Sequence, residues 1–127
     1  MTVAIGETLQ AATVIAKTTQ TLIGKIIACG AYDYITLFFA YTKGDETGLI
    51  ITPSVLFSAD GTAYPYNVKT EAAGATTLTD TKLTLTASKT SYMTFDVRGV
   101  AFIKFTQGGS NNDGTPTGTL AASYTLK

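Results

Sequence analysis

Residues 33–41 read Asp-Tyr-Ile-Thr-Leu-Phe-Phe-Ala-Tyr, and this stretch decides the fold of the 127-residue chain. Successive side chains of a β-strand point to opposite faces. One face would carry Ile35, Leu37, Phe39 and Tyr41, and the other Tyr34, Thr36, Phe38 and Ala40. Both faces are largely apolar, which predicts either a central strand or a strand whose outer face meets a partner.

The two-residue period recurs along the rest of the chain. It is clearest in residues 119–127, where Leu120, Ala122, Tyr124 and Leu126 alternate with small polar and apolar residues. Other runs of β-branched and aromatic residues are separated by Gly, Asp, Asn and Pro, as short strands are. The 25 threonines fit the same picture. We therefore predict an all-β chain, an antiparallel β-sandwich of eight to nine short strands, jelly-roll or Ig-like, with a closed barrel as the alternative.

Length and local breaks define the expected organisation. Residues 11–127 are predicted to form one β-sandwich domain, and residues 1–10 an N-terminal arm that orders on contact, although a helical turn over residues 6–12 is also compatible with the sequence. Gly24 lies inside a predicted strand and indicates a bulge or a close backbone approach. Pro53 places its strand at a sheet edge or at a bulge, because proline has no N–H to donate.

Charge is scarce and balanced. Lys plus Arg and Asp plus Glu number 9 each, and charged residues make up 14% of the chain. The basic residues form no cluster, so we expect no nucleic-acid partner. The apolar runs are too short to cross a bilayer and the N-terminus lacks signal-peptide features, so we expect no membrane association and synthesis in the cytoplasm. Cys29, the one cysteine, is expected to be a small buried hydrophobe.

The residues of catalysis are mostly missing. The chain has no histidine, the side chain that titrates nearest neutrality. Asp45 and Glu46 are adjacent in a glycine-flanked turn, where neighbours point apart, and are interpreted as a solvated turn rather than a catalytic pair. Residues 111–114, Asn-Asn-Asp-Gly, are typical of turns, with a calcium site as the less favoured interpretation. We therefore predict no enzyme activity, no cofactor and no metal.

Aromatic side chains provide the candidate site. Five of them are predicted to form an interface with neighbouring subunits or to pack over a sheet edge: Tyr34, Phe38, Tyr64, Tyr66 and Phe102. Tyr64 and Tyr66 flank Pro65 beside a predicted Asp60-Gly61 hairpin turn, and a small sugar-stacking patch is the alternative interpretation of that pair.

Two turns in the chain resemble a known pattern. Residues 34–49, Tyr-Ile-Thr-Leu-Phe-Phe-Ala-Tyr-Thr-Lys-Gly-Asp-Glu-Thr-Gly-Leu, are followed by Phe-Ser-Ala-Asp-Gly-Thr at residues 57–62. This order resembles small structural proteins of tailed bacteriophages, in which such a strand and turn feed a second strand that ends in an Asp-Gly-Thr turn. An aromatic residue, often Trp, follows that turn in those proteins; here Tyr64 stands nearby and the chain has no Trp.

The resemblance implies a β-sandwich component of a virion, such as a head decoration or minor capsid protein, with no catalytic residues. The expected function is a non-enzymatic protein that binds the outer surface of the assembled capsid and stabilises it. Its expected partners are the major capsid protein or other virion subunits and further copies of itself, for example in a trimer. The alternatives are a subunit of a phage tail, fibre or extracellular filament, and a carbohydrate-binding module for host attachment.

Overall fold

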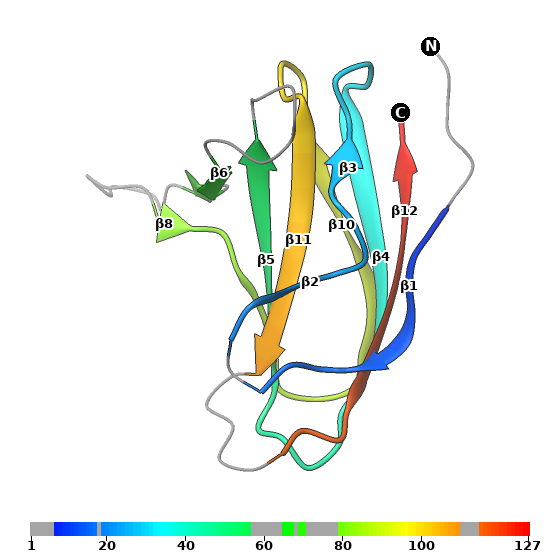
Figure 1. Cartoon of the computed structure of the whole chain (residues 1–127), viewed down its shortest axis with the longest axis vertical. Helices are drawn as coiled ribbons and strands as arrows, with labels where there is room; N and C mark the ends of the chain where they lie inside the picture. Colours follow the sequence, from blue (N-terminus) through cyan, green and yellow to red (C-terminus); the bar gives the residue numbers. More distant parts are fainter. Residues whose placement is uncertain (1–6, 18, 57–64, 68, 71–78, 110–114) are drawn as a thin grey trace.

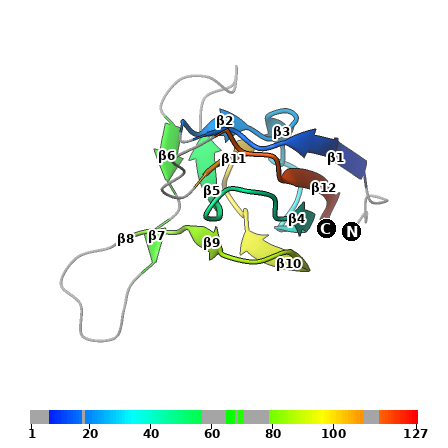
Figure 2. The same ribbon diagram turned by 90° about the horizontal axis from the view of Figure 1, so that it is seen from below.

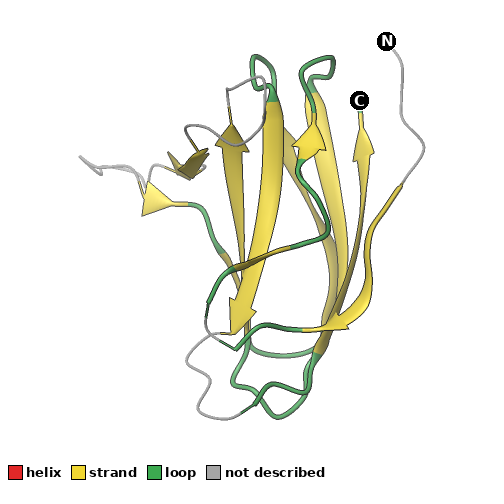
Figure 3. Ribbon diagram, viewed as in Figure 1, coloured by secondary structure: helices red, strands yellow, loops and turns green. Residues whose placement is uncertain are grey.

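The computed structural model describes residues 7–17, 19–56, 65–67, 69–70, 79–109 and 115–127. Within these ranges the regular structure consists of strands, with no helix, and most of it belongs to two antiparallel sheets (Figures 1 and 3). The predicted all-β antiparallel sandwich is therefore confirmed. No segment of the described chain is a helix that could span a membrane.

Sheet A contains four strands in the order β1-β12-β4-β10. Their bounds are Glu7–Val14 for β1, Thr119–Leu126 for β12, Tyr34–Thr42 for β4 and Lys89–Asp96 for β10. Figure 2 shows β1 and β10 at the two edges of this sheet. β4, which contains the apolar residues 34–41, is thus a central strand that pairs with β12 on one side and with β10 on the other.

Sheet B is built around two long strands, β5 (Leu49–Leu56) and β11 (Phe102–Gly109). The free side of β11 pairs with β2 (Thr21–Leu22) and β3 (Ile27–Ala28), and the free side of β5 pairs with β6 (Pro65–Asn67) and β9 (Leu83–Leu85). Each of these two edges is therefore shared by two short strands. A separate pair joins β7 (Lys69–Thr70) to β8 (Thr79–Asp80).

The pairings nest within one another. β1 pairs with β12, β2 and β3 pair with β11, β4 pairs with β10, and β5 pairs with β6 and β9. The chain is thus arranged as one long antiparallel hairpin that turns back after β5. One arm contains β1 to β5, and the other contains β6 and β9 to β12. The pairings of β12 with β4 and of β11 with β5 then join the wrapped arms into two sheets.

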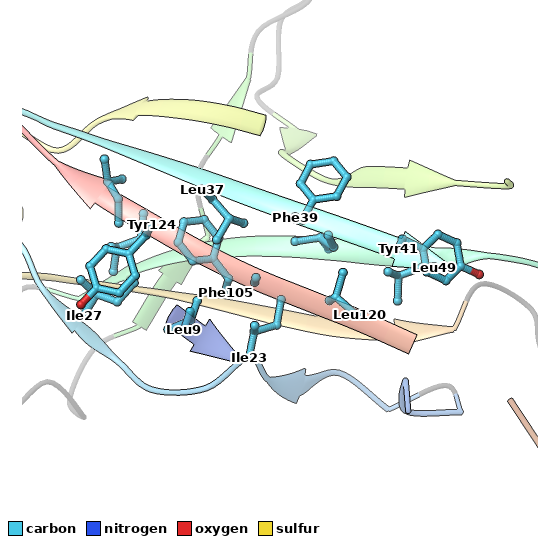
Figure 4. Packing of buried hydrophobic residues seen from close by; sticks show 14 of the residues in the cluster. Leu9, Ile23, Ile27, Leu37, Phe39, Tyr41, Leu49, Phe105, Leu120 and Tyr124 are labelled. Atoms are coloured by element: carbon cyan, nitrogen blue, oxygen red, sulfur yellow. The ribbon is translucent and has the colours of Figure 1, made fainter. Parts of the chain in front are cut away.

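The core lies between the two sheets and consists of alternate residues from each. Figure 4 shows Leu37, Phe39 and Tyr124 of sheet A in the same buried cluster as Phe105 of sheet B. Ile35, Leu37, Ile103 and Phe105 are fully buried. The face of β4 predicted from the two-residue period is thus the core face, and it removes several large side chains from water at about 1.5–3 kcal/mol each.

Two predicted breaks in the strands have physical explanations. Gly24 has φ of 63°, and a Cβ built on it would lie 2.0 Å from the backbone oxygen of Leu9. The predicted close backbone approach is therefore confirmed. Pro53 lies in β5, a central strand whose register with β11 is unbroken, so neither the predicted sheet edge nor a bulge in that pair is found. It is tolerated there because it falls between the residues that pair with β9 and those that pair with β6, where the ladder on that side is interrupted.

The N-terminal region is a strand from Glu7 onward. β1 pairs with β12 along its length, so residues 7–10 of the expected arm and of the possible helical turn belong to sheet A. The register shifts between Thr8 and Gln10 and again between Gln10 and Thr13. The Gln10 side chain donates a hydrogen bond to the Leu120 backbone oxygen at 2.9 Å and thereby helps to hold this irregular strand on its partner. Residues 1–6 lie outside the described residues.

The close approach at Gly24 predicts a large effect of one added methyl group. Gly24→Ala should lower the free energy of unfolding by about 2–4 kcal/mol, because the methyl group would collide with the Leu9 backbone and the backbone conformation is unfavourable for L-residues. Gly30→Ala is the matched control, since its Cβ would make only ordinary contacts, 3.8 Å from the Ala101 Cα. Urea denaturation of the wild type, Gly24→Ala and Gly30→Ala measures the free energies of unfolding. Equal stability of the two variants would contradict the close approach.

Candidate functional site

The outer face of sheet A is broad and almost uncharged. The register places Ser123 and Tyr92 beside Phe38, and Ala121 and Thr90 beside Ala40. The remaining outward positions of the three strands β12, β4 and β10 are Thr119, Thr125, Tyr34, Thr36, Thr42, Thr94 and Asp96. Asp96 is the single charged residue among these outward positions, and Arg98 binds it through its Nε at 3.0 Å.

Three aromatic side chains on this face are exposed. Tyr34 is 39% exposed, Phe38 40% and Tyr92 64%. The rings of Phe38 and Tyr92 lie side by side with centroids 6.1 Å apart. The Arg98 guanidinium lies 5.7 Å from the centre of the Tyr34 ring. The face therefore presents a row of apolar rings rather than the charged side chains that usually cover a solvent-facing sheet.

A shallow groove runs across the middle of the face. Its volume is about 380 Å³, and β1, β12, β4 and β10 all contribute to it. Its lining combines the Phe38 side chain with small and hydroxyl-bearing residues, together with the amide of Gln10. The lining residues are Thr8, Gln10, Ala11, Phe38, Phe39, Ala40, Thr90, Ser91, Ala121, Ala122 and Ser123. None of them carries a charge, so the groove suits an uncharged ligand or a neutral protein surface.

The outer face of sheet B differs from that of sheet A. Its outward positions on β5 include Thr52, Ser54 and Leu56, which are 8%, 6% and 1% exposed. Phe102, the first residue of β11, lies opposite Leu56 on this face and is half-buried. Because these outward side chains of β5 are already buried, the outer face of sheet A is the better candidate for contact with another molecule.

The structure brings together only part of the predicted aromatic set. Tyr34 and Phe38 share the outer face of sheet A, whereas Phe102 belongs to sheet B. Tyr66 lies in β6 opposite Val55, and Tyr64 lies outside the described residues. The sequence did not point to Tyr92, whose side chain is more exposed than those of Tyr34, Phe38 and Phe102. Its position two residues from Thr90 and Thr94 in an alternating strand was the available signal.

A second feature is a buried carboxylate at one end of the sandwich. Glu46 is 4% exposed. Its Oε2 accepts hydrogen bonds from the Tyr41 hydroxyl at 2.5 Å and the Gly44 N–H at 2.8 Å. Its Oε1 accepts hydrogen bonds from the Gly118 N–H at 2.8 Å and the Thr117 N–H at 3.2 Å. We call this arrangement the Glu46 clamp, because it ties the turn after β4 to the segment that leads into β12.

The clamp corrects the interpretation of Asp45 and Glu46 as a solvated turn. Asp45 is exposed as expected, but Glu46 points into the protein. Burial alone would raise the pKa of Glu46, yet the hydrogen bonds from Tyr41, Gly44 and Gly118 outweigh it and lower the pKa to about 2. Burial, with the adjacent Glu46 carboxylate, raises the pKa of Tyr41. The pair is therefore a Tyr41 hydroxyl that donates to an ionised Glu46, an arrangement that supports structure rather than proton transfer.

The remaining reactive groups provide no catalytic arrangement in the described part of the chain. Cys29 is fully buried, as predicted, and burial raises the pKa of its thiol to about 11, so the thiolate nucleophile does not form at neutral pH. The described residues contain no group of three or more acidic, Cys or His side chains that could hold a metal ion. The possible calcium loop at residues 111–114 lies outside the described residues.

The comparisons with known proteins bear on the fold. No protein-family model matches the chain, and no curated protein matches it. A chain in the solved structure of infectious bursal disease virus, Gx strain, is similar to this one, with a TM-score of 0.53 and 14% sequence identity. The similarity covers 98% of this chain and 31% of the viral chain. This chain therefore shares the fold of the matched part of the viral chain, and it spans about a third of the viral chain's length.

The Glu46 clamp predicts a pH-dependent stability. Because the pKa of Glu46 is about 2 in the folded protein and 4.5 ordinarily, its stabilisation is complete above pH 4.5 and is lost as the pH falls toward 2. Glu46→Gln should lower the free energy of unfolding at pH 7 by about 3 kcal/mol, and the difference from the wild type should shrink toward pH 2. Urea denaturation across this pH range measures both effects.

Asp45→Asn is the matched control for the clamp. It removes an adjacent carboxylate that is exposed, so its free energy of unfolding should stay within about 0.5 kcal/mol of the wild type. A Glu46→Gln variant as stable as Asp45→Asn at pH 7 would show that the buried carboxylate does not hold the two segments together.

Proposed function

We propose that this chain is a non-enzymatic structural component of a virion. In its more specific form, the proposal is an auxiliary protein that binds the outside of an assembled capsid. The observation that carries the proposal is the similarity of its fold, over 98% of its length, to a chain in the structure of infectious bursal disease virus. The resemblance of residues 34–49 and 57–62 to small structural proteins of tailed bacteriophages favours a phage capsid as the target. Both likenesses support a structural role rather than a catalytic one.

The strand order adds support from topology. If the two short strands that share each edge of sheet B are counted as one position, both sheets have four positions. These positions and the nested pairings favour a jelly roll, in which one long hairpin is wrapped into two sheets. Jelly rolls recur in viral capsid and lectin domains. We therefore propose the jelly-roll form of the predicted sandwich in preference to the Ig-like form.

The outer face of sheet A is the proposed contact with the shell. Phe38 and Tyr34 expose apolar rings on a face whose central positions carry no charge, so covering them with a capsid subunit would bury apolar area without desolvating charges. A protein that binds only the assembled shell stabilises it in proportion to the logarithm of its occupancy. The resulting location is the capsid surface of the virion.

Binding to shells tests this proposal. Purified shells that lack the chain should bind the added wild-type protein and melt at a higher temperature, as co-sedimentation and calorimetry measure. Phe38→Asp should weaken binding at least tenfold, because it places a charge on the proposed contact. Leu22→Asp is the matched control on β2 of sheet B, since Leu22 is 38% exposed and Phe38 40%. Absence of the chain from immunolabelled virions would overturn the proposal.

The groove on sheet A favours carbohydrate binding as a second candidate function. An exposed ring, Phe38, beside the hydroxyls of Thr8 and Ser123 and the amide of Gln10 offers a neutral sugar an apolar platform and hydrogen-bonding groups. This candidate corresponds to a host-attachment module and places the sugar site on sheet A rather than at Tyr64 and Tyr66.

A glycan array separates the two candidate functions. If the groove binds sugars, the wild-type protein should give specific signals that Phe38→Ala abolishes and Leu22→Ala retains. An array without signal above background would remove the carbohydrate candidate and leave the shell-binding proposal unaffected.

A further inference from the structure

The four sheet edges of the sandwich are protected unequally. A free edge strand can pair with another chain, and proteins usually prevent this with bulges, charges, prolines or very short edge strands. On sheet B both edges consist of strands of two or three residues, β2 and β3 on one side and β6 and β9 on the other. On sheet A, β1 is interrupted by two register shifts. Three of the four edges therefore carry a recognised form of protection.

β10 is the unprotected edge. Its eight residues pair with β4 in unbroken register from Lys89 to Asp96, and within the described chain β4 is its one strand partner. The six residues between those two ends, Thr-Ser-Tyr-Met-Thr-Phe, include no charge, no proline and no glycine. Figure 2 shows this strand at the rim of the sandwich, where β9 leads into it. A regular, neutral edge of this length is a template for strand pairing.

Apolar side chains flank the β10 edge on both faces. Tyr92 points to the outer face and is 64% exposed. Met93 and Phe95 point inward and remain only partly buried although they pack on the core. A strand added beside β10 would therefore satisfy its free backbone groups and also cover apolar surface on both sides of the sheet.

We infer that β10 pairs with β10 of a second copy of this chain, in an antiparallel, two-fold symmetric arrangement that joins the two A sheets. Symmetry selects this direction, because a two-fold axis perpendicular to the sheet reverses the second strand and brings the same free edge of β10 from both copies together. Of the four edges, β10 is also the one that is both long and unbroken, so a second β10 is the best-matched strand that another copy of this chain offers. Such an interface is self-complementary and closes as a dimer.

The pleat restricts the register of the dimer. Residues directly opposite each other in a sheet point to the same face, so the two-fold axis must pass beside a residue rather than between two residues. The axis nearest the middle of β10 passes Tyr92 or Met93. A head-to-tail alternative, β10 against β1 of another copy, would build open filaments, and the register shifts of β1 make it a poor partner for the regular β10.

The oligomeric state of the full chain tests the inference. Size-exclusion chromatography with light scattering should give twice the 13.3 kDa mass of one chain. Tyr92→Lys should give a monomer with an unchanged circular dichroism spectrum, because it sets a charged side chain from each copy at the axis or directly beside it. Thr8→Lys is the matched control, since Thr8 is also exposed on the outer face of sheet A but lies on β1, and it should remain a dimer.

Single-cysteine cross-linking locates the interface even if Tyr92→Lys fails to fold. Tyr92→Cys or Met93→Cys, whichever lies at the axis, should form a disulfide-linked dimer under mild oxidation, because opposite residues in a sheet lie within disulfide range. Thr8→Cys should not, and the native Cys29 is silent because it is fully buried.

Several results would overturn the inference: a monomer at millimolar concentration, a trimer, rods, or a dimer in which neither position 92 nor position 93 forms a cross-link. The inference does not depend on the proposed function, because the isolated chain is tested without shells. A monomer that still binds shells would overturn the dimer alone, and a cross-linked dimer absent from virions would overturn the virion role alone.

Discussion

The hydrogen bonds of the buried Glu46 carboxylate are the constraint on which the rest of the sandwich depends. Residues 43–48 carry the chain from β4 of sheet A to β5 of sheet B, and residues 115–118 lead back from sheet B to β12 of sheet A. Glu46 accepts hydrogen bonds from both connections. A single side chain therefore ties together two crossovers between the sheets, through residues that lie 72 positions apart in sequence.

The clamp also explains why glycine recurs around it. A Cβ on Gly118 would lie 2.2 Å from the Glu46 carboxylate, and a Cβ on Gly44 would lie 2.1 Å from the Thr117 hydroxyl. Gly48 approaches the Leu85 backbone just as closely, at 2.3 Å. Because Gly44 and Gly118 have no side chains, their two backbone segments come close enough to bind one carboxylate between them. An ionised group without water is stable there because four donors replace its hydration shell.

The parts of this architecture that depend on local alternation were predictable from the sequence. The two-residue period predicts the two faces of β4 and the buried residues of β12. A single glycine predicts the close approach at Gly24. The clamp was not predictable, because Tyr41 and Glu46 look like an ordinary strand end and turn until the partners at 117 and 118 are known. Tyr92 and the β10 edge were missed for the same reason, since exposure and edge position depend on strand order, which no local pattern encodes.

The same strand order accounts for the distribution of surface chemistry. Sheet A has its two central strands, β12 and β4, held from the core side by Leu120, Leu37 and Tyr124, so the core packing that stabilises them does not involve their outward residues. A sheet stabilised in this way needs no charge on its outer face for folding, but in water it gains solubility from charge. The scarcity of charge on the outer positions of sheet A is thus not required by the fold. An outer face and an edge without charge are what the proposed shell contact and the proposed β10 dimer would each require.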